Sequence, residues 1–141
     1  MMRIDYAKLS PKAYQGLIAC KNALSESSLG LSLVELVYLR VAQLNGCAFC
    51  LQLHSKALRG RGASQEKLDA LAGWDVAEVL SPREAAAISW TEAVTGVANS
   101  RAPDSVYQPL REHFNDAEIS DLTFAIALMN AFTRIAVAMR Q

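Results

Sequence analysis

Apolar residues recur along most of the chain every three to four positions, the spacing that places them on one face of an α-helix. No stretch alternates apolar and polar positions between hairpin turns, as a half-buried β-strand would. No linker, internal repeat or low-complexity segment divides the chain. The pattern therefore predicts an all-α protein in which six or seven helices form a single domain over residues 1–141.

Capping residues mark where these helices begin. Serine followed by proline opens a helix at Ser10 and again at Ser81, where Glu84 lies three residues further on and completes a capping box. Further helix starts are predicted at Ser64, Asp104 and Asn115. The helix after Asn115 contains the most apolar stretch of the chain.

Two helices in the first half of the chain form a predicted hairpin. Ser32 and Glu35 have capping-box spacing at the start of the run LVELVYLRVAQL, and this run ends at the turn signal Asn45-Gly46. The next helix is predicted to begin within residues 47–50 and to end near the glycines of RGRG. Because a tight turn joins them, the two helices are expected to lie antiparallel.

Two segments, Leu33–Leu44 and Leu122–Met139, are apolar most of the way around the helix. A helix that is apolar on all sides must be covered on all sides, and a domain of this size has a limited interior. We therefore expect a homo-oligomer in which these helices meet across subunits. The second segment is not expected to span a membrane, because its longest unbroken apolar run, Phe124–Met129, is far shorter than the roughly 20 residues that cross a bilayer.

Composition and charge argue against some classes of partner and favour one cellular compartment. Lys plus Arg total 14 and Asp plus Glu total 14, so the net charge is zero and no field steers the chain onto nucleic acid or an anionic membrane. Three cysteines are too few, and an odd number, for a disulfide framework. The first residues carry charges at Arg3 and Asp5 and lack the apolar core of a signal peptide. We expect a cytoplasmic protein with no nucleic acid and no membrane as partner.

The segment NGCAFCLQLHSK carries the candidate chemistry. Cys47, Cys50 and His54 stand at Cys-x-x-Cys-x-x-x-His spacing, which on a helix directs all three side chains to one side within about 60°. The cysteines fall in the first turn after Asn45-Gly46, where free N–H groups and the positive end of the helix dipole favour thiolate over thiol. Thiolate is the reactive form of a nucleophilic cysteine.

Glu35 is the predicted fourth member of this group. In an antiparallel hairpin about residues 45 and 46, Glu35 and His54 lie side by side. Apolar residues flank Glu35, so its carboxylate is expected to be desolvated and available for proton relay. A carboxylate beside an imidazole that in turn faces a thiol is the arrangement of base, orienting group and nucleophile in cysteine redox chemistry.

Other interpretations of these residues remain open. The two cysteines and the histidine would supply three of the four ligands of a structural zinc site. The candidates for the fourth ligand are Glu35, Cys20 and His113, none of which belongs to a second closely spaced pair. In another interpretation, Cys47 and Cys50 are simply residues of the hydrophobic core. Outside the motif, we interpret Cys20 as part of the core and His113 as structural.

In the residues ELVYLRVAQLNGCAFCLQLHSKALR, and further on in LSPREAAAISWTEAVT and MNAFTRIAVAMR, the chain resembles the alkylhydroperoxidase D-like proteins of the carboxymuconolactone decarboxylase superfamily. The resemblance covers nearly the whole chain. It implies an all-helical subunit and a homo-oligomer (trimer or hexamer). The implied activity is the thiol-dependent reduction of hydroperoxides, in which an external dithiol or protein is the reductant. Neither a metal nor a bound cofactor is expected.

Carried over residue by residue, the resemblance implies that Cys50 is the peroxidatic thiol and that Cys47 is the resolving thiol that closes a disulfide with it. It implies that Glu35 and His54 form the proton relay. Phe49 stands where the best characterised peroxidase of the family has a histidine, a difference that bears on the rate and the reductant. Members that decarboxylate lactones lack the cysteine pair, so the pair argues against decarboxylation. A thiol–disulfide switch or sensor without efficient peroxide turnover is the alternative.

Overall fold

The computed structural model describes residues 1–141 and contains nine α-helices, two 3-10 turns and no strand. The α-helices are α1 (Tyr6–Leu9), α2 (Pro11–Leu24), α3 (Leu31–Asn45), α4 (Ala48–Gly60), α5 (Gln65–Ala70), α6 (Pro82–Thr95), α7 (Val97–Ser100), α8 (Asp104–Tyr107) and α9 (Asp116–Met139), and the 3-10 turns are η1 (Leu71–Gly73) and η2 (Gln108–Glu112). The predicted all-α class is confirmed. The count exceeds six or seven because α1, α7 and α8 are four residues each, too short to show a repeating apolar pattern.

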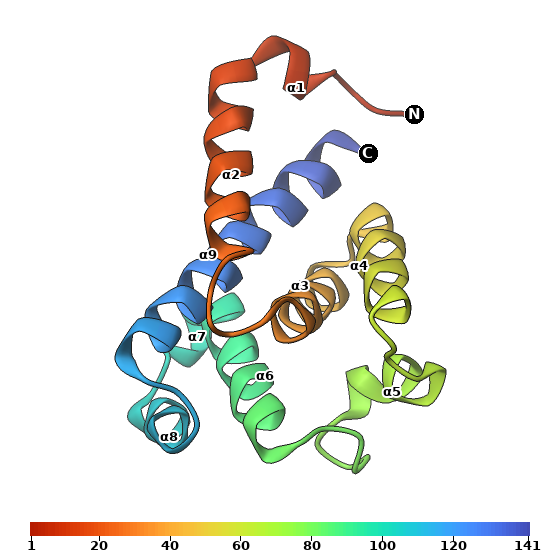
Figure 1. Ribbon diagram of the computed structural model, residues 1–141. Helices are drawn as coiled ribbons and strands as arrows, with labels where there is room; N and C mark the ends of the chain where they lie inside the picture. The colour runs from red at the N-terminus through yellow and green to blue at the C-terminus, as the bar shows by residue number, and fades with distance from the viewer.

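Helix α3 lies at the centre of the molecule, where α4, α6 and α9 pack around it (Figure 1). Its buried residues are Leu33, Val34, Leu36, Val37, Tyr38, Leu39, Val41 and Ala42. A helix covered by its own chain needs no second subunit to cover it, so the apolar character of α3 does not support the expected oligomer. On α9, in contrast, Phe124 is 61% exposed, and an apolar surface remains.

Helix α9 is long and apolar enough to cross a membrane by length and composition alone. It is instead packed along α3, α6 and α2. Its residues buried by these contacts are Ile119, Leu122, Ala125, Ile126, Leu128, Met129, Thr133 and Ala136. The apolar segment near the end of the chain is therefore a core helix.

Two of the predicted helix starts carry complete capping boxes. At the start of α6, Ser81 Oγ accepts a hydrogen bond from the backbone N–H of Glu84, whose carboxylate accepts one from the backbone N–H of Ser81. Asn115 and Glu118 are paired in the same way at the start of α9. The other predicted starts, at Ser10, Ser64 and Asp104, coincide with or directly precede the first residues of α2, α5 and α8.

Helix α3 starts differently from the prediction. Its N-cap is Gly30, at a φ of 85°, and Ser32 lies inside the helix. Ser32 Oγ accepts a hydrogen bond from Arg61 Nε at 3.1 Å, and the Glu35 carboxylate contacts His54. The predicted capping box between Ser32 and Glu35 is therefore wrong, because both side chains have partners on the neighbouring helix or at its end.

Helices α1 and α2 form an arm that stands out from the core and runs beside the last turns of α9 (Figure 1). The two ends of the chain are tied together: the backbone N–H of Arg3 donates to the Met139 carbonyl at 2.7 Å, and the Tyr6 hydroxyl donates to Gln141 Oε1. Between this arm, α4 and α9 lies a cavity.

Candidate redox site

The turn between α3 and α4 places the two motif cysteines. Helix α3 ends at Asn45, and Gly46 adopts a left-handed conformation at a φ of 66° that reverses the chain. Cys47 is the N-cap of α4, and Cys50 is in its first turn, as the turn signal predicts. The two cysteines form a disulfide, with their Cα atoms 5.2 Å apart. The Cys50 backbone N–H also donates to Cys47 Sγ at 3.3 Å.

The predicted contact between Glu35 and His54 is present. Glu35 Oε2 lies 2.6 Å from His54 Nδ1, and the two side chains are 15% and 3% exposed. With a carboxylate as partner, Nδ1 is the donor of this bond, which leaves Nε2 of a neutral imidazole as the nitrogen that can take up a proton. His54 follows Cys50 by four residues on the same face of α4, so the pair of His54 and Glu35 lies on the same side of this helix as the cysteine.

Tyr38 supports this pair from α3. Its ring centroid lies 5.3 Å from that of His54. Burial, then the charges of Glu35 and Cys20, raise the pKa of Tyr38 well above its usual value of 10. The hydroxyl, which therefore stays protonated, is buried without a hydrogen-bond partner within the chain. No pattern in the sequence distinguishes Tyr38 from the other core residues around it.

A cavity of about 160 Å³ opens onto Cys50 and His54, whereas Cys47 does not line it. Its wall is mostly apolar and comes from four helices and the end of the chain: Tyr6, Tyr14, Ile18, Lys21, Phe49, Cys50, Leu53, His54, Met129, Phe132, Ala136 and Gln141. A dry apolar cavity of about this volume holds a molecule the size of benzene. The cavity therefore has room for a small organic molecule beside Cys50.

The part of this wall formed by the arm was not predicted from the sequence. Tyr14, Ile18 and Lys21 follow one another at helical spacing on α2, which placed them on one face without saying what that face meets. Tyr6 and Gln141 come from opposite ends of the chain, and no local signal connects them.

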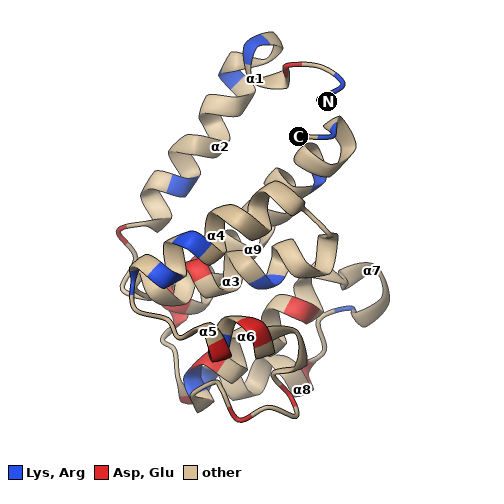
Figure 2. Cartoon of the chain, turned by 90° about the vertical axis from the view of Figure 1, so that its right-hand side faces the viewer, with Lys and Arg blue, Asp and Glu red and all other residues tan.

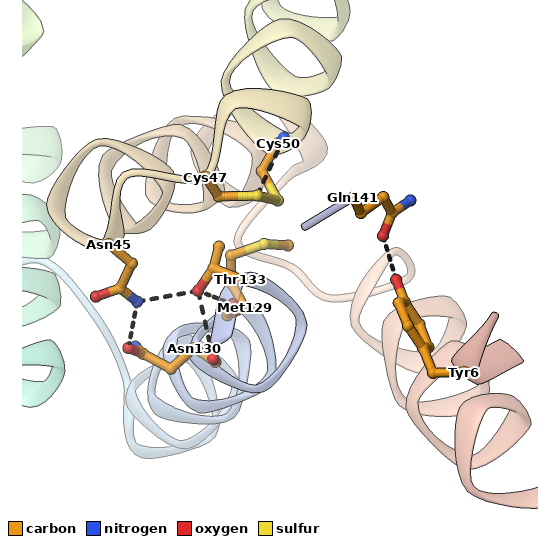
Figure 3. The surroundings of a disulfide bond; sticks show 8 residues. All are labelled: Tyr6, Asn45, Cys47, Cys50, Met129, Asn130, Thr133 and Gln141. Atoms are coloured by element: carbon orange, nitrogen blue, oxygen red, sulfur yellow. Dashed lines mark hydrogen bonds between the residues drawn. A yellow bond between two sulfur atoms is a disulfide. The ribbon is translucent and has the colours of Figure 1, made fainter. Parts of the chain in front are cut away.

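A polar network fastens the turn that carries the disulfide (Figure 3). Asn45 Nδ2 donates to Asn130 Oδ1 and to Thr133 Oγ1, both at 2.9 Å. The Thr133 hydroxyl donates to the Met129 carbonyl one turn earlier on α9 at 2.8 Å. Polar residues within an otherwise apolar helix were the signal that could have identified these anchors.

The remaining candidate residues lie apart from the motif. No three His, Cys, Asp or Glu side chains come together in a group that could hold a metal ion. Cys20 is a free, half-buried thiol on α2 that packs against the core. His113 follows η2, where its backbone N–H donates to the Leu110 carbonyl at 3.0 Å.

Comparison with known proteins gives a consistent result. Residues 11–93 match the model of the carboxymuconolactone decarboxylase family. The chain is 31% identical to the uncharacterized protein YdfG of Bacillus subtilis over an alignment of 137 residues. This alignment covers 97% of this chain and 93% of YdfG.

Solved structures extend the likeness to the fold. One of them is a protein of unknown function from Agrobacterium tumefaciens, suggested to be the antioxidant defence protein AhpD. Its superposition covers 100% of this chain and 97% of the Agrobacterium chain, with 38% sequence identity and a TM-score of 0.96. An uncharacterized peroxidase-related protein from Ralstonia eutropha has a TM-score of 0.83 over 95% of this chain and 72% of its own. Its 21% identity makes this a likeness of fold alone.

Proposed function

Because the chain belongs to the carboxymuconolactone decarboxylase family, we propose that it is a thiol-dependent peroxidase that reduces organic hydroperoxides through Cys50 and Cys47. The observation that carries this proposal is the position of Cys50, which is joined to Cys47 in a disulfide and lines an apolar cavity together with a carboxylate-bound histidine. A redox-active pair, a proton relay and space for an organic molecule thus meet at one place.

The first step oxidises Cys50 and reduces the peroxide. His54 Nε2, with Nδ1 held by Glu35, accepts the proton of the Cys50 thiol. The thiolate attacks the terminal oxygen of the hydroperoxide, the O–O bond breaks, and Cys50 becomes a sulfenic acid. The departing alkoxide takes the proton back from His54 and leaves as an alcohol.

The second step closes the disulfide. The Cys47 thiol attacks the Cys50 sulfur, the S–O bond breaks, and water leaves. An external dithiol then reduces the pair and is itself oxidised to a disulfide. The balanced reaction consumes one hydroperoxide and one dithiol and yields one alcohol, one water and one oxidised dithiol.

The surroundings of the two sulfurs favour attack by the reductant on Cys50. The cavity reaches Cys50 and not Cys47. The sulfur that is expelled is then Cys47, whose Sγ already accepts a hydrogen bond from the Cys50 backbone N–H at the start of α4. Such a contact stabilises a departing thiolate.

The cellular setting and the assembly belong to the same proposal. A cycle that depends on an external dithiol or protein reductant fits the reducing cytoplasm. The exposed apolar surface of α9 around Phe124 is where we expect copies of the chain to meet in a homo-oligomer, a trimer or hexamer. Native mass spectrometry of the purified protein measures the number of copies.

The test is the consumption of cumene hydroperoxide by the purified protein with dithiothreitol as reductant, after subtraction of the protein-free rate. We expect turnover by the wild type and by the control Cys20→Ser, and none by Cys50→Ser. Turnover by Cys50→Ser at the wild-type rate would overturn the proposal. If the wild type also shows no peroxide turnover but forms the disulfide when peroxide is added, the protein is a thiol–disulfide switch.

A further inference from the structure

Lys21 is the one residue with a charged side chain among those that line the cavity at Cys50. It follows Tyr14 and Ile18 at positions that share one face of α2, so its side chain belongs to the wall that the arm contributes. Of the twelve lining residues nine are hydrophobic, and the other two polar ones, His54 and Gln141, already have hydrogen-bond partners within the chain.

The Lys21 ammonium has no such partner. No carboxylate lies within ion-pair distance of it, and its side chain makes no hydrogen bond, whereas Lys8 and Lys67 on other helices are each paired with an acidic residue. Few charged residues lie along α2 or the last turns of α9 (Figure 2). A cation on the wall of an apolar cavity, with no carboxylate of the chain within ion-pair distance, is complementary to an anionic ligand.

The residues on one side of the cavity are more deeply buried than Lys21 on the other side. Cys50 and His54 are 4% and 2% exposed and form its buried side, whereas Lys21 is half-buried. A lysine in this position lays its aliphatic stem along the apolar wall and keeps its ammonium where water and ligands reach it. A ligand bound between these two sides would have its reactive group at Cys50, an apolar body in the middle and an anionic group at Lys21.

We propose that the cavity selects short organic hydroperoxides that carry a carboxylate, with Lys21 as the residue that binds the carboxylate. This inference rests on the proposed peroxidase function and names its substrate class. The volume of about 160 Å³ limits the enclosed part of the substrate to a body of roughly benzene size. We choose a carboxylate as the anion because its single charge matches the single unpaired ammonium on the wall, and the two form a charge-assisted hydrogen bond.

The experiment compares a tertiary alkyl hydroperoxide that bears a terminal carboxylate with its methyl ester, which has the same reactive group and no charge. Initial rates of peroxide consumption give kcat/KM for the wild type and for Lys21→Met, which keeps the length of the side chain and removes its charge. Lys21→Arg keeps the charge. Lys12→Met removes an exposed charge from the same helix, outside the cavity.

We expect the wild type to prefer the acid over the ester by roughly tenfold or more, the range of a hydrogen bond to a charged group. Lys21→Met should lose this preference through a higher KM for the acid, with the ester unchanged. Lys21→Arg and Lys12→Met should keep it. Added salt should reduce the preference in the wild type, because it screens a charge that is half-exposed.

The inference fails if wild type and Lys21→Met treat the acid and the ester alike. It also fails if Lys21→Met slows both substrates equally, since Lys21 would then act on the Cys50 thiolate rather than on the substrate. Either result leaves the peroxidase function intact. A wild type that consumes neither compound, nor cumene hydroperoxide, overturns the proposed function instead.

Discussion

The two walls of the cavity are built in different ways. One wall is α4, where Cys50 and His54 are almost completely buried and rest on α3, the helix with the most complete coverage by its own chain. The opposite wall is the arm of α1 and α2, in which Leu24 is the one buried residue. The residues that we propose to react are therefore held by the core, and the residues that we propose to contact the substrate are held by the periphery.

The hydrogen bonds that hold the two walls in place differ in the same way. The turn before Cys47 is tied to α9 by half-buried side-chain hydrogen bonds of Asn45, and Glu35 holds His54. The arm is tied by exposed bonds at the ends of the chain, such as that of Tyr6 to Gln141. Segments with few buried contacts open at low free energy, so we expect the arm to move more readily than the wall formed by α4.

The largest effect on the reactive wall is expected from Cys47→Ser. Without a resolving thiol, peroxide should leave Cys50 as a sulfenic acid, with no intramolecular disulfide and a loss of turnover of about a hundredfold or more. Intact-mass analysis after one equivalent of peroxide, with a sulfenic acid trap, measures this. Cys20→Ser is the control and should form the disulfide. An untrapped, unmodified Cys47→Ser protein would move the peroxidatic role to Cys47.

Glu35→Gln should have the next largest effect. The amide keeps the shape of the side chain but cannot act as a carboxylate for His54, so oxidation of Cys50 should slow by about tenfold to a hundredfold. The second-order rate of disulfide formation by stopped flow checks this, with Glu26→Gln, an exposed glutamate on the surface, as the control. A wild-type rate in Glu35→Gln would remove this residue from the relay.

A smaller, selective effect is expected on the opposite wall from Tyr14→Ala. Tyr14 makes edge-on contacts with Tyr6 and Phe132, at centroid distances of 6.1 and 6.4 Å. Its loss should raise KM for organic hydroperoxides by roughly tenfold, in line with one aromatic contact, and leave the reaction with hydrogen peroxide unchanged. Tyr107→Ala is the matched control, because that ring packs edge-on against Trp90 away from the cavity.

If Tyr14→Ala slows hydrogen peroxide as much as organic substrates, the arm supports the reactive wall as well, and the division between the two walls does not hold.

The smallest effect is expected from Tyr38→Phe, behind the reactive wall. The hydroxyl has no hydrogen-bond partner in the chain, so its removal should change the free energy of unfolding by no more than about 1 kcal/mol, with a gain rather than a loss. Urea unfolding near pH 8 measures this. A loss of several kcal/mol would show that the hydroxyl is a stabilising donor in solution.

The same variant tests the electrostatics of Tyr38. Burial raises its pKa above the ordinary value of 10.0, so the unfolded chain releases the proton first. The stabilising contribution is complete below pH 10 and is lost as the pH rises above it. Unfolding curves measured on both sides of that pH should show a smaller alkaline loss of stability in Tyr38→Phe than in the wild type.

Much of the reactive wall was predictable because its geometry is local. Helical spacing places Cys50 and His54 on one side of α4, with Cys47 as the N-cap directly before it, and a tight turn brings Glu35 next to His54. Serine, proline and glycine signals located most helix ends for the same reason, since capping depends on a few consecutive residues. The exception was Ser32, whose capping role was displaced by a contact with the end of α4.

The opposite wall, formed by the arm, could not be predicted in this way. Whether Lys21 shares a cavity with Cys50, or Asn45 is held by Asn130, depends on the angles at which separate helices cross and on which faces they bury. The sequence by itself determined the longer helices, the closely spaced thiol pair and the contact of Glu35 with His54, because these follow from contacts within one turn or one hairpin. Only the tertiary structure decided what faces the thiol, because residues distant in the chain meet through the packing of the whole core.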